Sequence, residues 1–393
     1  MPISDLIRLD EKIKAERGIE HTPKEIAQQP DVWLAAAEGV YAQAGLLRGI
    51  FGGGDDGAEV ILTGAGSSYF AGISAEAALT LALGRPVRAV SSTEIVMSPE
   101  SLLPKAPFVL VSLARSGNSP EGNAAFEMAE ALRGEFVRHV VITCNPDGVL
   151  ARLANGTRRP AVLCVLPPET NDQGLAMTSS FTSLVVAAQA LGYLDRRSEY
   201  LGIVENLVAA ARLILDRYAD PLAALAEAPF RRAFFVGARP FFGAALESHL
   251  KVQEMTGGEV VGKAEDTLGL RHGPMAAVDR ETLVVLFGSR SAYRRQYERD
   301  LLIEIVQKGL GMKRVTAAPA AGDDLRDLAH LHVEFDPSGE LGIPDELATV
   351  LLVMPAQILG LYKGLALGLS PDLPSKERVI NRVVQGVNIY PWS

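Results

Sequence analysis

The chain has 393 residues, enough for two domains, and its 48% apolar and 22% charged residues are ordinary for a folded protein. Its formal net charge of −9 argues against a general nucleic-acid binder, which needs Lys and Arg clustered on one face. No basic and apolar leader opens the chain, and no apolar run reaches the length of a membrane span, so we expect a cytoplasmic protein that binds neither nucleic acid nor membrane.

The first fifty residues favour helices. Residues 22–25, Thr-Pro-Lys-Glu, are typical of a helix start with proline in the first turn, and residues 31–45 carry apolar side chains at helical spacing. Residues 51–57, Phe-Gly-Gly-Gly-Asp-Asp-Gly, then predict a turn or linker. We therefore expect an N-terminal helical extension over residues 1–50.

Beyond this linker, apolar strands alternate with helical stretches in two successive sets, separated by a helical stretch at 201–226. Continuous apolar strands separated by helices are typical of a parallel sheet covered on both faces. The first set predicts strands at 60–63, 87–90, 108–113, 139–143 and 162–166 and helices at 69–83, 121–132 and 181–191. The second set predicts strands at 234–236, 283–287, 315–316 and 333–335 and helices at 242–256, 296–310 and 346–369.

The two sets also resemble each other in sequence, because residues 64–72 have a weaker echo in residues 237–243. We therefore expect an α/β protein with two doubly wound parallel-sheet domains, at 51–205 and 206–375, followed by a tail at 376–393 near the active site.

Ligands of doubly wound sheets bind at the carboxyl ends of the strands, so the candidate site is sought in the loops there. Residues 64–68, Gly-Ala-Gly-Ser-Ser, follow the first expected strand. They begin like a dinucleotide fingerprint but lack its third glycine, and simple turn chemistry also explains them. The hydroxyls of Ser67 and Ser68 at a helix start fit a phosphate better than a dinucleotide.

The loop at 114–121, Ala-Arg-Ser-Gly-Asn-Ser-Pro-Glu, is more specific. Ser119 is expected to cap a helix that begins with Pro120, and Gly117 permits a tight turn that aims the hydroxyls of Ser116 and Ser119 at one point. This pattern predicts a cradle for a phosphomonoester, with a merely well-capped helix as the alternative. A third loop, at 170–181, again places small hydroxylated residues before an apolar helix.

The second domain carries different chemistry. Lys251 and Glu254 are three residues apart and share a helix face, a spacing that usually means a solvated salt bridge. Downstream, His272 stands in a loop framed by glycine and proline. A carboxylate and an imidazole are the groups that sugar ring opening and proton transfer between adjacent carbons need.

Metal and thiol chemistry are not expected. The six histidines are scattered, and no Cys-x-x-Cys pair occurs, so we predict no metal site. Cys144 and Cys164 lie within expected strands, where small buried hydrophobic residues are the simplest interpretation.

As an ordered set, these motifs resemble the galactosamine-6-phosphate deaminase/isomerase family of AgaS type. Members of this family are also called tagatose-6-phosphate ketose/aldose isomerases and have two sugar-isomerase (SIS) domains. The likeness covers nearly the whole chain, with a more distant likeness to the isomerase half of glucosamine-6-phosphate synthase. The matching segments are 62–68, 114–121, 142–145, 176–182, 271–274 and 381–387.

The resemblance implies a role for each candidate residue and no cofactor. Glu254 would move a proton between C1 and C2, Lys251 would be its electrostatic neighbour, and His272 would assist ring opening in the site of a partner subunit, which implies a homodimer. Ser67, Ser68, Ser116 and Ser119 would hold the phosphate, while Gly66, Arg115, Thr178, Ser179 and Gln385 would line the sugar.

The implied reaction converts D-galactosamine 6-phosphate to D-tagatose 6-phosphate and ammonia by ring opening, proton transfer and hydrolysis of a C2 imine, so we expect an isomerase, a deaminase and a hydrolase. Glucosamine-6-phosphate deamination and plain ketose/aldose isomerisation need the same groups. A non-catalytic phosphosugar sensor is a different class, but residues 1–50 lack the basic recognition helix of a DNA-binding regulator. The sequence does not fix the configuration at C4.

Overall fold

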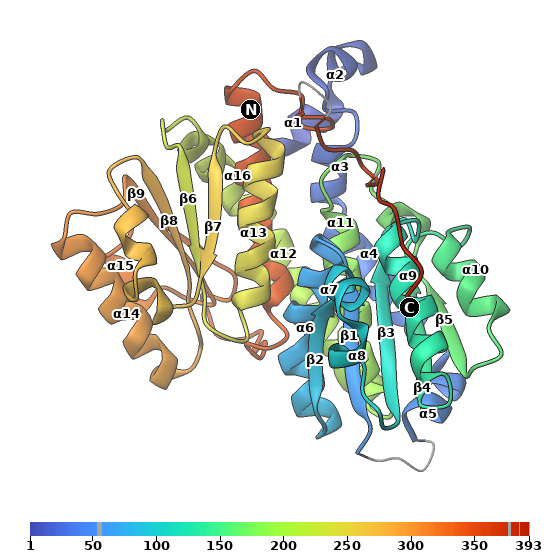
Figure 1. Ribbon diagram of the computed structural model, residues 1–393. Helices are drawn as coiled ribbons and strands as arrows, with labels where there is room; N and C mark the ends of the chain where they lie inside the picture. Colours follow the sequence, from blue (N-terminus) through green and yellow to red (C-terminus); the bar gives the residue numbers. More distant parts are fainter. Residues whose placement is uncertain (53–56, 376–378, 385, 393) are drawn as a thin grey trace. The chain divides into compact units, whose positions relative to one another are not determined.

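The computed structural model describes residues 1–52, 57–375, 379–384 and 386–392 (Figure 1). The chain forms two compact units, and each combines segments that are far apart in the sequence. Unit 1 consists of Met1–Pro30, Gln173–Thr178 and Glu205–Val379, and unit 2 consists of Asp31–Asp172, Ser179–Val204 and Ile380–Ser393. The domain boundaries expected at 50, 205 and 375 divide the chain in linear order and stay a prediction.

Unit 2 is built on a parallel five-stranded sheet in the order β2-β1-β3-β4-β5. Thr63 pairs with Ser112, and Ala114 pairs with Thr143, so β1, β3 and β4 end at the same edge of the sheet. The loops that follow β1 and β3 are therefore neighbours. The strands are β1 (Glu59–Gly64), β2 (Val87–Ser91), β3 (Phe108–Ala114), β4 (Val137–Thr143) and β5 (Ala161–Val165).

Helices cover both faces of this sheet because its strands are apolar on both sides. A Cβ at Gly72 of α6 would lie 3.1 Å from Leu62, so the helix approaches this face closely. On the opposite face, Ile61 and Phe108 join a cluster with Ala125 of α9. The helices are α5 (Ala44–Gly52), α6 (Ser67–Leu83), α7 (Ser92–Met97), α8 (Pro99–Leu102), α9 (Pro120–Arg133), α10 (Val149–Gly156) and α11 (Ser179–Ala190), while α4 (Gln29–Tyr41) and α12 (Arg197–Ala226) contain unit boundaries.

Unit 1 holds a second parallel five-stranded sheet, in the order β10-β9-β8-β6-β7, of which Figure 1 labels β9, β8, β6 and β7. Phe234 and Leu286 pack against Leu301 of α14 on one face. The strands are β6 (Arg232–Val236), β7 (Val261–Glu265), β8 (Thr282–Phe287), β9 (Lys313–Ala318) and β10 (Leu331–Glu334). The helices are α1 (Ile3–Arg8), α2 (Glu11–Arg17), α3 (Thr22–Ala27), α13 (Phe242–Met255), α14 (Ala292–Gln307), α15 (Gly322–Arg326) and α16 (Thr349–Ala366).

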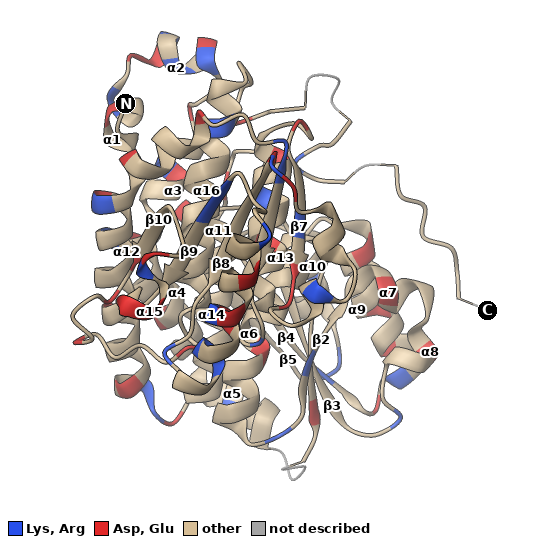
Figure 2. Cartoon of the chain, turned by 90° about the vertical axis from the view of Figure 1, so that its left-hand side faces the viewer, with Lys and Arg blue, Asp and Glu red and all other residues tan. Residues whose placement is uncertain are grey.

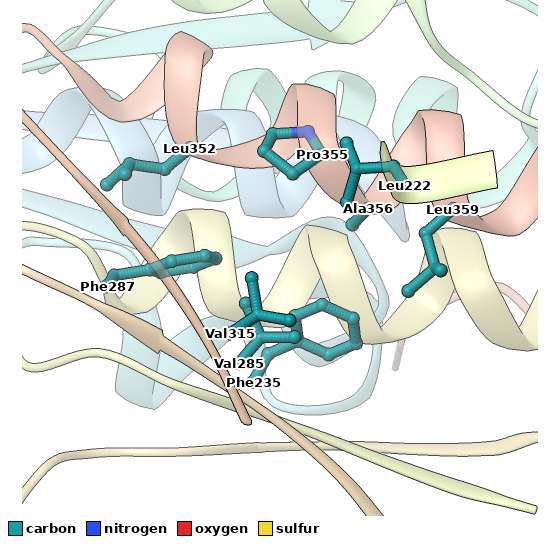
Figure 3. Close-up of a pocket in the computed structure, with 9 residues that line it drawn as sticks. All are labelled: Leu222, Phe235, Val285, Phe287, Val315, Leu352, Pro355, Ala356 and Leu359. Carbon is teal, nitrogen blue, oxygen red and sulfur yellow. The ribbon is translucent and has the colours of Figure 1, made fainter. Parts of the chain in front are cut away.

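α16 corrects one expectation, because it is long and apolar enough to cross a membrane by length and composition. However, 89% of it is buried inside the protein, so it is a core helix. A void of about 10 Å³ lies beside its Pro355, lined by nine apolar residues (Figure 3). This space is close to the lower limit for one water molecule and offers no polar partner, so it is a packing defect and not a ligand site.

α14 and α15 of unit 1 carry many charged residues. Figure 2 shows acidic and basic residues close together on α14 and α15, and Arg295 pairs with Asp324 at 2.9 Å. Both sheets are parallel with flanking helices, and helices open the chain, so the expected α/β class with an N-terminal helical segment is confirmed.

Candidate active site

The loop after β1 turns directly into α6. Gly64 is required there, since a Cβ at this position would lie 2.7 Å from Ser68 and 3.0 Å from the carbonyl oxygen of Leu113. Gly66 precedes the helix with a φ of 55°, a conformation that favours glycine. Ser67 and Ser68 are the first two residues of α6, each 6% exposed. They therefore stand at the positive end of a long helix, where anions bind.

The loop after β3 has the predicted cap. The Ser119 hydroxyl accepts from the N–H of Gly122 at 3.5 Å and donates to Glu121 Oε2 at 2.7 Å. Gly117 has a φ of 64°, and the Ser116 hydroxyl accepts from the N–H of Asn118 at 3.2 Å. Helix capping, the alternative explanation of this motif, is thus present. A phosphate bound here would replace Glu121 as the acceptor for Ser119.

A tail residue that the sequence analysis did not single out connects two loops of unit 2. Arg115 is 6% exposed and donates from Nη2 to the carbonyl oxygen of Arg382 at 2.6 Å. The guanidinium of Arg382 donates to the carbonyl oxygen of Asp172 at 2.8 Å and to Asn171 Oδ1 at 2.8 Å. Arg382 therefore joins the loop after β3 to the loop after β5. Gln385, the expected sugar contact of the tail, lies outside the described residues.

Thr178 and Ser179 are fully buried, and the division between the units falls between them. The carbonyl oxygen of Thr178 accepts from Gln357 Nε2 at 3.4 Å within unit 1. Ser179 begins α11, and its hydroxyl has no hydrogen-bond partner among the described residues. Buried hydroxyls are nearly always bonded, so this hydroxyl is an exception to the usual pattern.

α13 brings the expected catalytic pair together. Lys251 Nζ donates to Glu254 Oε2 at 2.5 Å and lies 3.3 Å from Glu247 Oε1. The side chains of Lys251 and Glu247 are fully buried, whereas that of Glu254 is 20% exposed. A solvated surface pair is therefore the wrong description of Lys251. Burial alone would lower the pKa of Lys251. The negative charges of Glu247 and Glu254 outweigh this effect, so the pKa lies above its usual value.

His272 lies in an exposed turn of unit 1 between the short 3-10 helices Gly269–Arg271 and Pro274–Ala277. Gly273 has a φ of 123°, which requires glycine, and Arg271 anchors the turn to Glu304 of α14 at 2.6 Å. Within the described part of the chain, the imidazole makes no hydrogen bond or ion pair, so none joins it to Glu254. The loop framed by glycine and proline that the sequence predicts is present.

The two cysteines are free and buried, and burial raises the pKa of each thiol to about 12, as expected of structural residues. Over the described ranges, no group of three or more His, Cys, Asp or Glu side chains is placed to hold a metal ion. The expectation that the reaction needs neither metal nor cofactor stays a prediction.

Known proteins are similar to this chain in both sequence and fold. Residues 56–193 match the SIS domain family. Over 94% of its length, the chain is 40% identical to a candidate D-galactosamine-6-phosphate deaminase AgaS of Streptomyces coelicolor, covering 95% of that protein. It is 36% identical to D-galactosamine-6-phosphate deaminase AgaS of Escherichia coli O157:H7, covering 94% of this chain and 96% of that protein.

Among solved structures, tagatose-6-phosphate ketose/aldose isomerase from Escherichia coli superposes with a TM-score of 0.84 at 32% identity, covering 95% of this chain and 97% of that one. The C-terminal domain of glucosamine-fructose-6-phosphate aminotransferase from Francisella tularensis superposes with a TM-score of 0.74 at 18% identity, covering 92% of this chain and 98% of that one. The more distant likeness shows a shared fold.

The expectation of a hydrolase is wrong. The relatives are named as a deaminase and as a ketose/aldose isomerase, and neither name is that of a hydrolase. The expectations of an isomerase or deaminase, of SIS domains and of a sugar-phosphate enzyme agree with these relatives. The chain belongs to the AgaS family of SIS-domain sugar-phosphate deaminase/isomerase enzymes.

Proposed function

We propose that this chain converts D-galactosamine 6-phosphate to D-tagatose 6-phosphate and ammonia. The observation that carries the proposal is the Glu254–Lys251 pair, in a chain 36% identical over 94% of its length to an enzyme named for this substrate. Glu254 is exposed enough to meet a substrate, and the buried ammonium of Lys251 fixes the orientation of its carboxylate. This arrangement suits a general base.

In this mechanism, His272 assists the opening of the sugar ring, and Glu254 then takes the proton from C2 of the open-chain amino sugar. Delivery of that proton to C1, together with a second proton that O1 gains as the amino group loses one, turns the C1 aldehyde into a CH₂OH group and leaves a C2 imine. The amino nitrogen leaves as ammonia, and the overall balance takes up one water molecule. The transfer from C2 to C1 by Glu254 is general acid–base catalysis by a positioned side chain.

The loops after β1, β3 and β5 supply the substrate contacts in this proposal. Hydroxyl groups at the starts of α6 and α9 suit a dianionic phosphate, because helix N-termini favour negative charge. The phosphate contacts are Ser67, Ser68, Ser116 and Ser119, and the sugar contacts are Gly66, Arg115, Thr178, Ser179 and, from the tail, Gln385.

A substrate panel tests the proposal. Galactosamine 6-phosphate, glucosamine 6-phosphate, tagatose 6-phosphate and unphosphorylated galactosamine are each incubated with the protein, and ammonia and ketose are measured in parallel. Equal amounts of ammonia and tagatose 6-phosphate from the first compound are expected. Three other results would contradict the proposal. A preference for glucosamine 6-phosphate would indicate a deaminase for the gluco epimer, and isomerisation without ammonia would indicate a plain ketose/aldose isomerase. Tight binding without turnover would indicate a non-catalytic sensor.

We further propose a cytoplasmic homodimer in which His272 completes the site of the partner. The exposed position of this histidine supports the idea. Mixing inactive Glu254→Gln and His272→Ala proteins should give about half heterodimers with one intact site each, and hence about a quarter of the wild-type activity. Mixed dimers that are verified by mass and remain inactive would contradict the sharing of sites.

A further inference from the structure

Glu247 is a buried carboxylate on α13 that the mechanism above does not use. It stands one helical turn before Lys251, with Oε1 3.3 Å from Nζ, and both side chains are 0% exposed. Glu254 lies 2.5 Å from the same ammonium group and is 20% exposed. Lys251 is therefore held between a carboxylate that solvent and substrate do not reach and a carboxylate that they can reach.

The charges of this trio decide whether Lys251 keeps a counter-ion when Glu254 takes up a proton. With all three groups ionised, the net charge is −1, and protonation of Glu254 leaves Lys251 and Glu247 as a neutral ion pair. Without the charge of Glu247, the same step would deprive the fully buried ammonium of both carboxylates that flank it. Burial of an unpaired charge is strongly unfavourable, so the proton transfer would be opposed.

Among the residues that the structure describes, the other charged groups on the elements packed against α13 do not replace Glu247. His249 of α13 has its pKa lowered by burial, so it is neutral at neutral pH. On α16, which packs against α13, the charged residue is Lys363, and its Nζ donates to a backbone carbonyl. On the strands next to α13, Lys263 pairs with Glu265 and Arg232 pairs with Asp279. The pKa of Lys251 accordingly responds to Glu247 and Glu254.

We propose that Glu247 is the permanent counter-ion of Lys251 and thereby a positioning residue that leaves Glu254 free to cycle between its ionised and protonated forms. The inference rests on the proposed function, because it concerns the proton that Glu254 carries. Glu247 itself neither touches the substrate nor exchanges a proton with it.

Glu247→Gln tests the proposal, since it preserves the shape of the side chain and removes its charge. Turnover should fall about 10- to 100-fold while KM changes by less than about threefold. The alkaline limb of the kcat–pH profile should also move to lower pH. In the variant, only Glu254 is left to offset the effect of burial, so the pKa of Lys251 falls. Glu247→Asp should recover part of the activity. A purely structural role would lower stability without moving this limb.

Glu298→Gln is the matched control, because it makes the same change at another carboxylate of unit 1 that is 3% exposed. It should leave the alkaline limb where it is in the wild type.

A second readout needs no substrate, so it separates this inference from the proposed function. The Lys251 signal of protein carrying ¹⁵N-labelled lysine, assigned with Lys251→Met, is titrated by NMR in wild-type and Glu247→Gln protein. Titration at lower pH in the variant supports the proposal even if no sugar phosphate is turned over. Titration at the same pH in both proteins, or wild-type turnover in Glu247→Gln, would overturn it.

Discussion

Ser116 holds its loop by accepting one hydrogen bond, from the N–H of Asn118, and its half-buried hydroxyl can still donate to a phosphate. Ser116→Ala should raise KM about 10- to 100-fold, since a hydrogen bond to a charged group contributes about 1.5–3 kcal/mol. Steady-state kinetics on the phosphorylated sugar measures this. Ser101→Ala removes an exposed hydroxyl of the same unit and serves as control. An unchanged KM in Ser116→Ala would exclude this loop from the site.

Glu298 makes the stability of the protein depend on pH. Burial raises the pKa of this carboxyl to about 7, and the negative charge of Asp345 raises it further. The hydrogen bond from the N–H of Ser289 and the positive charges of Arg295 and Arg294 act in the opposite direction and are outweighed. The folded state therefore holds the proton more tightly than the unfolded state. The contribution to the free energy of unfolding, on the order of 3 kcal/mol, is present below about pH 4.5 and is lost as the pH rises through about 7.

Glu298→Gln should accordingly flatten the pH dependence of the melting temperature between about pH 5 and 8, because the amide stays neutral throughout. Calorimetry of wild-type and variant protein across this range is the measurement. Parallel curves for the two proteins would show that Glu298 does not titrate in this range.

The sequence pointed to Lys251 and Glu254 because residues three apart share a helix face, but it could not show that the lysine is buried. That burial comes from α16, where Gly360 permits close approach: a Cβ there would lie 3.2 Å from the carbonyl oxygen of Lys251. Glu247 was missed for the same reason, since a carboxylate one turn before a lysine is ordinary on a helix surface.

At the scale of elements, the predicted strands were those with continuous apolar runs. β3 is buried along almost its whole length, and its residues were read correctly from the sequence. β7 was missed because it is an edge strand, with Val261 56% exposed and Gly262 and Lys263 interrupting the pattern. Short helices such as α7 and α10 were also not predicted, because they span too few turns to show a period.

The tail is an element whose role depends on contacts far from it in sequence. Arg382→Ala removes three hydrogen bonds to the loop after β5, so the tail should be cleaved faster by a protease and KM should rise. Arg382→Lys, which keeps the charge but not the two-sided donor geometry, should give an intermediate result. Limited proteolysis followed by mass spectrometry measures the effect. Equal cleavage rates in Arg382→Ala and wild type would show that these bonds do not hold the tail.

At the scale of the whole molecule, local sequence patterns predicted two sheets but not the assembly of each unit from separate segments. Thr22 donates to Asp372 through its N–H at 2.7 Å and its hydroxyl at 2.6 Å, across 350 residues of sequence. In the same unit, Gln29 donates to Gln357 at 2.7 Å. Such bonds form only when distant segments of the folded chain meet. Local sequence patterns therefore predicted the N-terminal helices but not that these helices belong to unit 1.

Glu254 as the base between C1 and C2 is tested most directly by following the transferred proton. Turnover of galactosamine 6-phosphate in deuterium oxide should place solvent deuterium at C1 or C2 of the recovered sugars, detected by NMR. Glu254→Gln keeps the size of the side chain but cannot accept the proton, so turnover and deuterium uptake should fall together by about 10² to 10⁴-fold while KM is preserved. Near-normal turnover in this variant, with the same deuterium uptake as the wild type, would contradict the assignment of the base to α13.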